Sequence, residues 1–249
     1  MPGALPLKKR TKGRRRWLRR GLLTVLVLAL LPVVEVGCTR VVNPPFTPEM
    51  IRFQLFSKDE AARKRGLRYE WMPLGKIPRA QVRMIWASED QRFFEHGGID
   101  LEEIRDALDE AKEKGGAPRG ASTITMQCAR SVFLWQGRSW LRKVLEAYYT
   151  VLMELLLPKH RILELYLNVI EFGPGVYGVK AAAETFYGKE PAQLTQSQMA
   201  MLAAVMPNPK EWSVTKPSAR VRARQQRVLR LERNAVFPAG KLPSEEHGH

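Results

Sequence analysis

One apolar run near the N-terminus limits what this chain can fold into more than any other feature. Residues 21–38 are predominantly apolar, with Glu35 as their only charged residue. Crossing the hydrocarbon core of a bilayer takes about 20 residues, a length that this run reaches when flanking residues such as Trp17 contribute. A block of lysines and arginines precedes the run. The pattern predicts a transmembrane helix over residues 21–38, with a basic segment, residues 1–20, in the cytoplasm.

Two other interpretations of this N-terminus compete with an uncleaved anchor. A cleaved signal peptide needs small residues around its exit site, and this run has no clear small-x-small pattern. Gly37-Cys38 resembles a lipoprotein signal, but Glu35 stands where that signal has an apolar residue. We favour a single uncleaved span and leave open whether Cys38 carries a lipid.

Composition narrows the class of protein further. The chain has 249 residues and a formal net charge of +16, which suits an anionic membrane surface or an anionic substrate. Nucleic acid is not an expected partner, because aromatic side chains do not alternate with the basic ones. The two cysteines, Cys38 and Cys128, imply no disulfide framework. Without a C-x-x-C motif or a histidine cluster, a zinc site is not expected either.

Proline and hydrophobic periodicity divide the rest of the chain. Residues 39–78 contain the stretch Asn-Pro-Pro-Phe-Thr-Pro, which fits neither a regular helix nor a central strand. We interpret this segment as juxtamembrane. Helical periodicity then predicts a mainly α domain over residues 79–236, followed by a polar tail, residues 237–249. The expected helices include one capped by Asp100 and ended by Gly115-Gly116, one opening at Ser122, one from Trp140 to Leu157, one starting near Val179, one capped by Thr195, and a basic surface helix within residues 216–234.

The stretch W-A-S-E-D-Q-R-F-F-E-H-G-G-I-D, from Trp86 to Asp100, carries the strongest hint of chemistry. Glu89 and Asp90 follow directly after a segment that should be buried. A carboxylate at the edge of apolar packing can have a raised pKa, which suits general acid–base catalysis. On pattern alone, a helix start that favours acidic residues explains the stretch at least as well.

Basic and hydroxyl side chains gather in two later segments. If Ser122 opens a helix, then Thr123, Gln127 and Arg130 fall on one face, a combination that suits a phosphate-bearing ligand. A solvated helix face would show the same pattern. Further along, Arg142, Lys143 and Glu146 stand on the flank of a broad apolar stripe. Such an i, i+4 pair ordinarily does no more than stabilise its helix.

Taken together and in order, these segments resemble the signatures of the peptidoglycan glycosyltransferases, which also form half of the class A penicillin-binding proteins. The matching positions are Glu89-Asp90-x-x-Phe93-x-x-His96-x-Gly98-x-Asp100, Arg119-Gly120-x-Ser122-Thr123 with Gln127, Arg142-Lys143-x-x-Glu146-Ala147, much of residues 164–188, and Pro207-Asn208-Pro209. Three positions depart from the pattern, because Met126 replaces a glutamine, Arg130 a lysine and Ser131 an asparagine.

The resemblance implies a lysozyme-like helical domain with two lobes, a cleft between them and a smaller lobe embedded in the membrane. It implies an enzyme that polymerises lipid II into β-1,4-linked glycan strands and releases undecaprenyl pyrophosphate. Glu89 would act as the general base and Glu146 as a second catalytic carboxylate. The substrate-binding residues implied are Asp90, Phe93, His96, Arg119, Ser122, Thr123, Gln127, Arg130, Arg142 and Lys143.

The resemblance also sets expectations for cofactors and surroundings. No cofactor is certain from the resemblance, but some family members use a divalent cation (Mg²⁺ or Mn²⁺), for which the sequence identifies no ligands. The expected partners are lipid II, the growing strand, membrane lipids and proteins of cell-wall synthesis or division. The anchor would cross the inner membrane once and place the catalytic domain in the periplasm.

Two alternatives remain at this stage. A lysozyme-like muramidase would share the fold and a catalytic glutamate, but would have little use for the basic cluster. A non-enzymatic membrane partner of a cell-wall complex would explain Met126 and Ser131 as signs of decay. The presence of both Glu89 and Glu146 argues against that second alternative.

Overall fold

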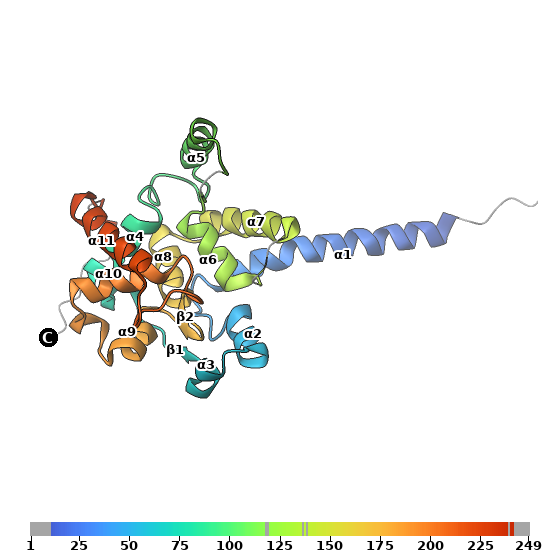
Figure 1. The fold of residues 1–249 in the computed structure, drawn as a ribbon. Helices are drawn as coiled ribbons and strands as arrows, with labels where there is room; N and C mark the ends of the chain where they lie inside the picture. Colours follow the sequence, from blue (N-terminus) through green and yellow to red (C-terminus); the bar gives the residue numbers. More distant parts are fainter. Residues whose placement is uncertain (1–10, 118–119, 136, 138, 239, 242–249) are drawn as a thin grey trace, which may run out of the picture.

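In the computed structural model, one long helix, α1 (Thr11–Cys38), projects from a body formed by the rest of the chain (Figure 1). The structure describes residues 11–117, 120–135, 137, 139–238 and 240–241. Within α1, the part from Arg16 to Cys38 is long and apolar enough to cross a membrane, judged by length and composition. The helix begins inside the basic block, earlier than the predicted span.

The body is almost entirely helical, as predicted. In chain order its elements are α2 (Pro48–Phe56), α3 (Glu60–Arg65), β1 (Arg68–Tyr69), the 3-10 helix η1 (Leu74–Lys76), α4 (Arg79–Glu89), α5 (Leu101–Lys114), α6 (Ile124–Phe133), α7 (Trp140–Leu156), α8 (Lys159–Val169), β2 (Glu171–Gly173), β3 (Val176–Tyr177), α9 (Val179–Tyr187), η2 (Pro191–Gln193), α10 (Gln196–Val205) and α11 (Ala219–Asn234). The three short strands form one sheet in the order β1-β3-β2, with β1 parallel and β2 antiparallel to β3. We did not predict these strands, because two or three residues are too few to show a period of two.

Several helix ends follow the signals in the sequence. Asp100 caps α5 by accepting the N–H of Glu103 at 2.9 Å, and Gly115 ends that helix in the left-handed conformation. Thr195 opens α10 with a capping box, as predicted. The prediction that Ser122 opens a helix was one residue early. Thr123 is the cap of α6, because its hydroxyl accepts the N–H of the residue three positions on.

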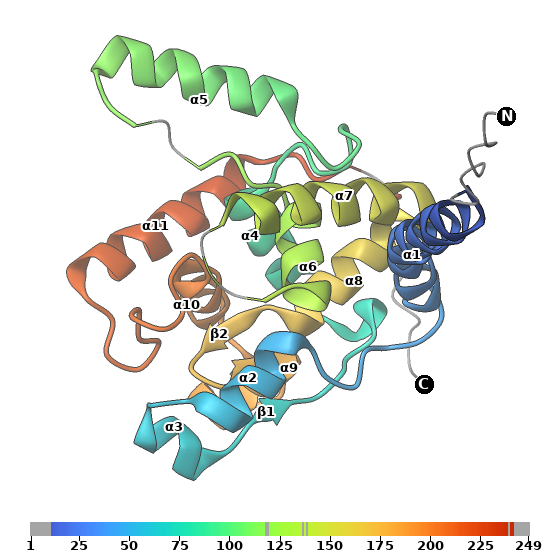
Figure 2. The ribbon, with the colours of Figure 1, turned by 90° about the vertical axis from the view of Figure 1, so that its right-hand side faces the viewer.

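Two helices occupy the centre of the body. On α8, the side chains of Ile162, Leu163, Leu165 and Tyr166 are fully buried, and the helix contacts α6, α9 and η1. On α10, every residue from 199 to 205 is buried against α4, α11 and β2. These central helices hold α4 and α6 in place. Figure 2 shows α4 and α6 in the interior, beneath α7.

The apolar stripe of α7 faces outward rather than toward the core. Leu141, Val144 and Leu155 on this stripe are exposed, whereas Glu146 and Thr150 on the opposite face are fully buried. A surface helix of a soluble protein shows the reverse pattern. The helix packs along α1 (Figures 1 and 2), where the hydroxyl of its Tyr148 donates to a backbone carbonyl of α1. The exposed stripe therefore continues the apolar surface of α1.

The backbone of Gly178, just before α9, lies close to the backbone of Asn168, and this contact leads to a first prediction. Gly178 has φ = +84°, and a Cβ atom added there would lie 2.6 Å from the carbonyl oxygen of Asn168. Both the backbone strain and the clash oppose a side chain, so we expect Gly178→Ala to lower the free energy of unfolding by about 2–3 kcal/mol. Thermal unfolding of the detergent-solubilised chain measures this. Gly75→Ala is the matched control, because nothing lies within 4 Å of its added Cβ. Equal melting temperatures for the two variants would contradict the prediction.

Candidate active site

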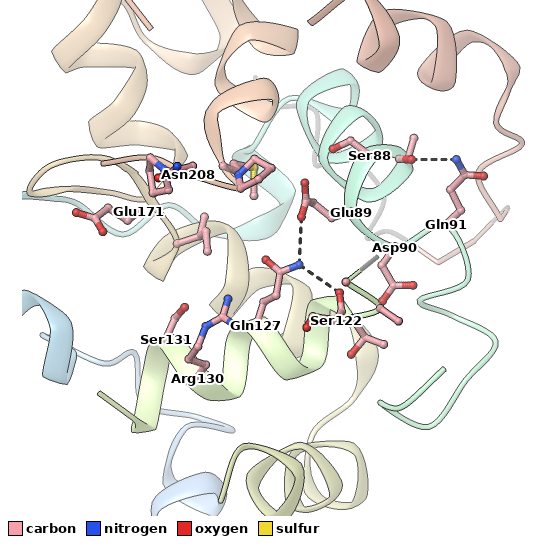
Figure 3. A pocket seen from close by; sticks show the side chains of 18 of the residues that line it. Ser88, Glu89, Asp90, Gln91, Ser122, Gln127, Arg130, Ser131, Glu171 and Asn208 are labelled. Carbon is pink, nitrogen blue, oxygen red and sulfur yellow. Dashed lines mark hydrogen bonds between the residues drawn. The ribbon is translucent and has the colours of Figure 1, made fainter. Parts of the chain in front are cut away.

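A polar cleft of about 1110 Å³ crosses the body beside α6. Its walls come from the end of α4, the start of α5, the exposed side of α6, strand β2, the turn after α10 and one face of α11. Figure 3 shows the side chains of Glu89, Gln127, Arg130 and Glu171 within it. The cleft thus gathers side chains from segments more than 100 residues apart in the chain.

Glu89 is the last residue of α4, and hydrogen bonds hold its carboxylate in place. One of its oxygens accepts a hydrogen bond from Arg224 at 2.8 Å, and the other accepts one from the amide of Gln127 at 3.1 Å. The hydroxyl of Tyr166 donates to the oxygen of that amide at 3.0 Å, which fixes the direction of the amide. Figure 3 shows Glu89 and Gln127 pointing toward each other. The carboxylate is therefore held by two donors at the edge of the core.

Burial decides the proton affinity of Glu89. Removal from water raises its pKa, while the charge of Arg224 and the hydrogen bond from Gln127 lower it in part, so that the net pKa lies above its ordinary value. The side chain is 9% exposed. A carboxyl group with a raised pKa that faces a cleft has the properties of a general base.

The turn after Glu89 is closed by its neighbour Asp90. One oxygen of Asp90 accepts the N–H of Ile124, the first residue of α6, at 2.9 Å. The Nε2 atom of His96 lies 3.1 Å from both oxygens of Asp90, while its Nδ1 accepts the N–H of Gly98. The imidazole is therefore the Nε2–H tautomer and donates to Asp90. This arrangement ties the turn to α6 and brings Glu89 opposite Gln127.

The structure places two of the predicted substrate-binding residues below the cleft rather than in its wall. Phe93 is fully buried, and the ammonium of Lys159 lies 4.4 Å from its ring centroid. His96 packs beneath Asp90, and neither side chain lines the cleft. Both support the turn that carries Glu89, and their contact with substrate stays a prediction.

The predicted substrate-binding residues on α6 and just before it do form the floor of the cleft. Ser122, Thr123, Gln127 and Arg130 all line it. The hydroxyl of Thr123 also donates to the carbonyl of Gly98 at 2.6 Å. Arg119, another residue predicted to bind the substrate, lies outside the described residues.

All three positions that depart from the family pattern lie on α6, and Arg130 among them lines the cleft. Ser131 lines the cleft, whereas Met126 is buried in the core. The substitution at position 126 therefore leaves the cleft wall unchanged.

A buried carboxylate gathers three cations beside this floor. Glu146 is fully buried and lies 2.5 Å from a guanidinium nitrogen of Arg142, 2.7 Å from the ammonium of Lys143 and 4.0 Å from Arg130. The predicted contact between Arg142 and Glu146 is confirmed. Three positive charges against one negative charge leave an excess that suits a dianionic or pyrophosphate ligand. Because its oxygens face cations, Glu146 is suited to hold them in place rather than to accept a proton.

Arg224 is a site residue that the sequence analysis missed. We predicted a basic surface helix for this part of the chain, but α11 packs on α4 and α10 through Val221, Gln225 and Val228. Arg224 and Arg227 then face the cleft. The apolar residues of α11 indicated a buried face, yet nothing in the sequence indicated that Arg224 would meet Glu89, 135 positions away.

A second acidic group lies in the cleft near β2. Glu171 accepts the N–H of Gly175 at 3.2 Å, and burial raises its pKa to about 7. Lys210 lies 3.9 Å from Glu171 and 2.7 Å from Glu49. The sequence analysis assigned no role to Glu171, although it lies within the residues 164–188 that match the family pattern. Among the described residues, no group of three or more His, Cys, Asp or Glu side chains is placed to hold a metal ion.

The fold and the site together define a class of protein: a helical domain beside an apolar helix, with a carboxyl group of raised pKa on a cleft and a cluster of cations that reaches this cleft at Arg130. Comparison with known sequences gives the family. The sequence model described as Transglycosylase matches residues 58–232, so the match starts inside the predicted juxtamembrane segment. The chain belongs to this family, as the resemblance indicated.

Curated relatives named biosynthetic peptidoglycan transglycosylase cover most of the chain. The relative from Xanthomonas euvesicatoria pv. vesicatoria is 46% identical over 224 residues, which is 90% of this chain and 90% of the relative. The relative from Caulobacter vibrioides is 46% identical over 215 residues, 86% of this chain and 90% of the relative. The relative from Xylella fastidiosa is 43% identical over 214 residues, 86% of this chain and 88% of the relative.

The buried cation cluster generates a second prediction. Glu146→Gln would leave Arg142 buried without its counter-charge, so we expect the free energy of unfolding to fall by about 3 kcal/mol. Denaturant unfolding of the full chain in detergent measures the loss. Asp109→Asn serves as the control, because its contact with Lys112 is solvent-exposed and should contribute less than about 1 kcal/mol. A loss no larger for Glu146→Gln than for Asp109→Asn would refute the role given to the cluster.

Proposed function

We propose that this protein polymerises lipid II into the β-1,4-linked glycan strands of peptidoglycan, with Glu89 as the general base. One observation carries the proposal: Glu89, a carboxyl group of raised pKa, lines the same cleft as Arg130, which together with Arg142 and Lys143 surrounds Glu146. Membership of the Transglycosylase family and the names of the curated relatives support this reaction class.

The proposed reaction is a single displacement. Glu89 takes the proton from the 4-hydroxyl of the acceptor's N-acetylglucosamine. The oxygen then attacks the anomeric carbon of the N-acetylmuramic acid at the reducing end of the donor strand. Undecaprenyl pyrophosphate leaves with the electron pair of the broken bond, and the α-linked donor becomes a β-1,4 link. The configuration inverts without a covalent enzyme intermediate.

The leaving group needs charge stabilisation rather than a proton. A pyrophosphate is already a good leaving group, and fixed cations stabilise the charge that develops on it. Arg130, Arg142 and Lys143 are the cations proposed for this role, with Arg119 as a further candidate outside the described residues. Glu146 would orient two of them. A divalent cation, Mg²⁺ or Mn²⁺, stays a prediction from the resemblance.

The membrane position follows from two apolar surfaces. We propose that α1 crosses the inner membrane once, with the basic N-terminus in the cytoplasm and the catalytic domain in the periplasm. The exposed stripe of α7 and the exposed apolar residues around α2, including Ile51, Leu55 and Phe56, would rest in the same bilayer. The growing strand and membrane lipids would be partners there. Proteins of cell-wall synthesis or division stay a prediction.

The two alternatives are less well supported by the site. A muramidase would need no cation cluster, whereas Arg130, which lines this cleft, belongs to one with Arg142 and Lys143. A non-enzymatic partner would have no reason to keep Tyr166, Gln127 and Arg224 arranged around Glu89. Met126, taken as a sign of decay, is buried away from the cleft.

The base generates a third prediction. With labelled lipid II and detergent-solubilised full-length protein, we expect a ladder of products that lysozyme digests. Glu89→Gln removes the proton acceptor and should lower the rate by about 10²–10⁴-fold while the protein stays folded. Glu95→Gln, an exposed glutamate of the same turn, is the control and should polymerise normally. Normal polymerisation by a folded Glu89→Gln protein would overturn the assignment.

The contact between Arg224 and Glu89 generates a fourth prediction, on pH dependence. The base must be ionised, so kcat/KM should rise with pH through the pKa of Glu89. Arg224 lowers that pKa, so Arg224→Ala should move the acid limb to higher pH. Arg224→Lys should restore most of the wild-type profile, and Arg222→Ala, on the exposed side of α11, should not change it. An unmoved acid limb in Arg224→Ala would show that the contact does not tune the base.

A further inference from the structure

We propose that Glu171 and Tyr177, in the wall of the cleft near β2, bind the side-chain ammonium group of the stem peptide that lipid II carries. This inference rests on the proposed function and extends it to a part of the substrate that takes no part in the reaction. Both side chains line the cleft. Figure 3 shows Glu171 in a part of the cleft away from Glu89 and Asp90.

Two short strands bring these side chains together. Glu171 begins β2 and Tyr177 ends β3, and the two residues are partners in the antiparallel pairing of these strands. Paired residues of an antiparallel sheet place their side chains next to each other on the same face. The N–H of Gly175, in the turn between the strands, donates to one oxygen of Glu171 at 3.2 Å and fixes that carboxylate.

The charge of Glu171 is less well compensated than that of its neighbour Glu49. Glu49 accepts hydrogen bonds from Arg52 and from Lys210, each at 2.7 Å. Lys210 lies 3.9 Å from the second oxygen of Glu171, which is beyond hydrogen-bonding distance. Burial raises the pKa of Glu171 to about 7, although the charge of Lys210 lowers it in part. A positively charged ligand would supply a counter-charge to this buried carboxylate.

Tyr177 gives a second and independent indication of a ligand. The residue is 1% exposed, and its hydroxyl makes no hydrogen bond with any described residue. Burial raises its pKa, and the charges of Glu171 and Glu49 raise it further, so the hydroxyl lies near these carboxylates and stays protonated. A buried hydroxyl without a partner is costly. A ligand that donates a hydrogen bond to its oxygen would remove that cost.

The chemistry of lipid II favours one of its groups as this ligand. Its sugars offer hydroxyls and acetamides and its lipid link offers phosphates, whereas a primary amine on the stem peptide is positively charged at neutral pH. An ammonium has three donors and no acceptor, which matches a carboxylate and a hydroxyl oxygen. Phosphates would be repelled by Glu171 and Glu49.

The length of the stem peptide also suits this position. An extended chain advances about 3.3–3.6 Å per residue, so the third residue of the stem can lie about 10 Å from its sugar. An amine on that residue can therefore occupy a part of the cleft other than the one that holds the reacting sugars at Glu89.

Acetylating the amine tests the proposal on the wild-type protein. Lipid II with a free stem-peptide amine is compared with the same lipid in which that amine is acetylated and therefore neutral. We expect KM to be about tenfold higher for the acetylated lipid, with kcat within about twofold, because a hydrogen bond to a charged group is lost. Equal KM values for the two lipids would overturn the proposal.

Variants assign the effect to the two residues. Glu171→Gln should raise KM for the free-amine lipid about tenfold and abolish the difference between the two lipids. Tyr177→Phe, which removes only the hydroxyl, should reduce that difference to about threefold. Glu60→Gln is the control, because it changes an exposed glutamate of α3 outside the cleft, and it should keep the full difference. A full difference that persists in either folded cleft variant would overturn the assignment.

Photolabelling gives a measurement that does not depend on activity. A lipid II analogue with a diazirine in the amine-bearing side chain of its stem peptide, and with the amine free, is bound to the Glu89→Gln protein in nanodiscs and irradiated. Mass spectrometry should place the label within residues 171–177 or 206–210, and acetylation of the amine should remove it. Label elsewhere, or label that survives acetylation, would overturn the site.

The two proposals fail in different ways. If the wild-type protein makes no polymer from lipid II, the proposed function fails. If the wild type polymerises both lipids with equal KM, only the assignment of the amine to Glu171 and Tyr177 fails.

Discussion

The site depends on one carboxylate that does no chemistry in the proposed reaction. Asp90 accepts the first N–H of α6 and holds His96, so it joins the turn after α4 to the start of the next wall of the cleft. An anionic group at a helix N-terminus is favoured by the unpaired N–H groups there. Because Glu89 directly precedes Asp90, this contact sets where the base lies relative to Gln127. The family resemblance placed Asp90 among the substrate-binding residues, and its observed contacts describe a structural role as well.

Acidic residues arrange cations in the cleft and beside it. Glu146, on α7, is itself fully buried and contacts Arg142 and Lys143. Glu89 is itself contacted by Arg224, which opposes the effect of burial on its pKa. In the proposed reaction, the first arrangement would hold positive charge for the leaving group. The second would keep Glu89 able to ionise and serve as the base.

The apolar surfaces explain how such a charged cleft can work on a lipid-linked substrate. The stripe of α7 and the residues around α2 face outward and continue the surface of α1. The buried face of α7 carries Glu146, which contacts Arg142, and Tyr149, whose hydroxyl donates to the carboxylate of Glu35 on α1. A single helix thus presents hydrocarbon to the bilayer on one side and orders the active site on the other. This division reverses the usual distribution of polarity on a surface helix.

Local patterns in the sequence determined much of this protein. The apolar helix, the caps at Asp100 and Thr195, the contact between Arg142 and Glu146, and the choice of Glu89 all depend on residues within a few positions of one another. Such short-range signals can be identified directly from periodicity and spacing. Tertiary structure alone decided that Arg224 meets Glu89, that Glu171 joins the cleft, that the stripe of α7 faces outward and that two- and three-residue strands pair. Each of these depends on which distant segments pack together, and side-chain burial and long-range electrostatics exist only once that packing has formed.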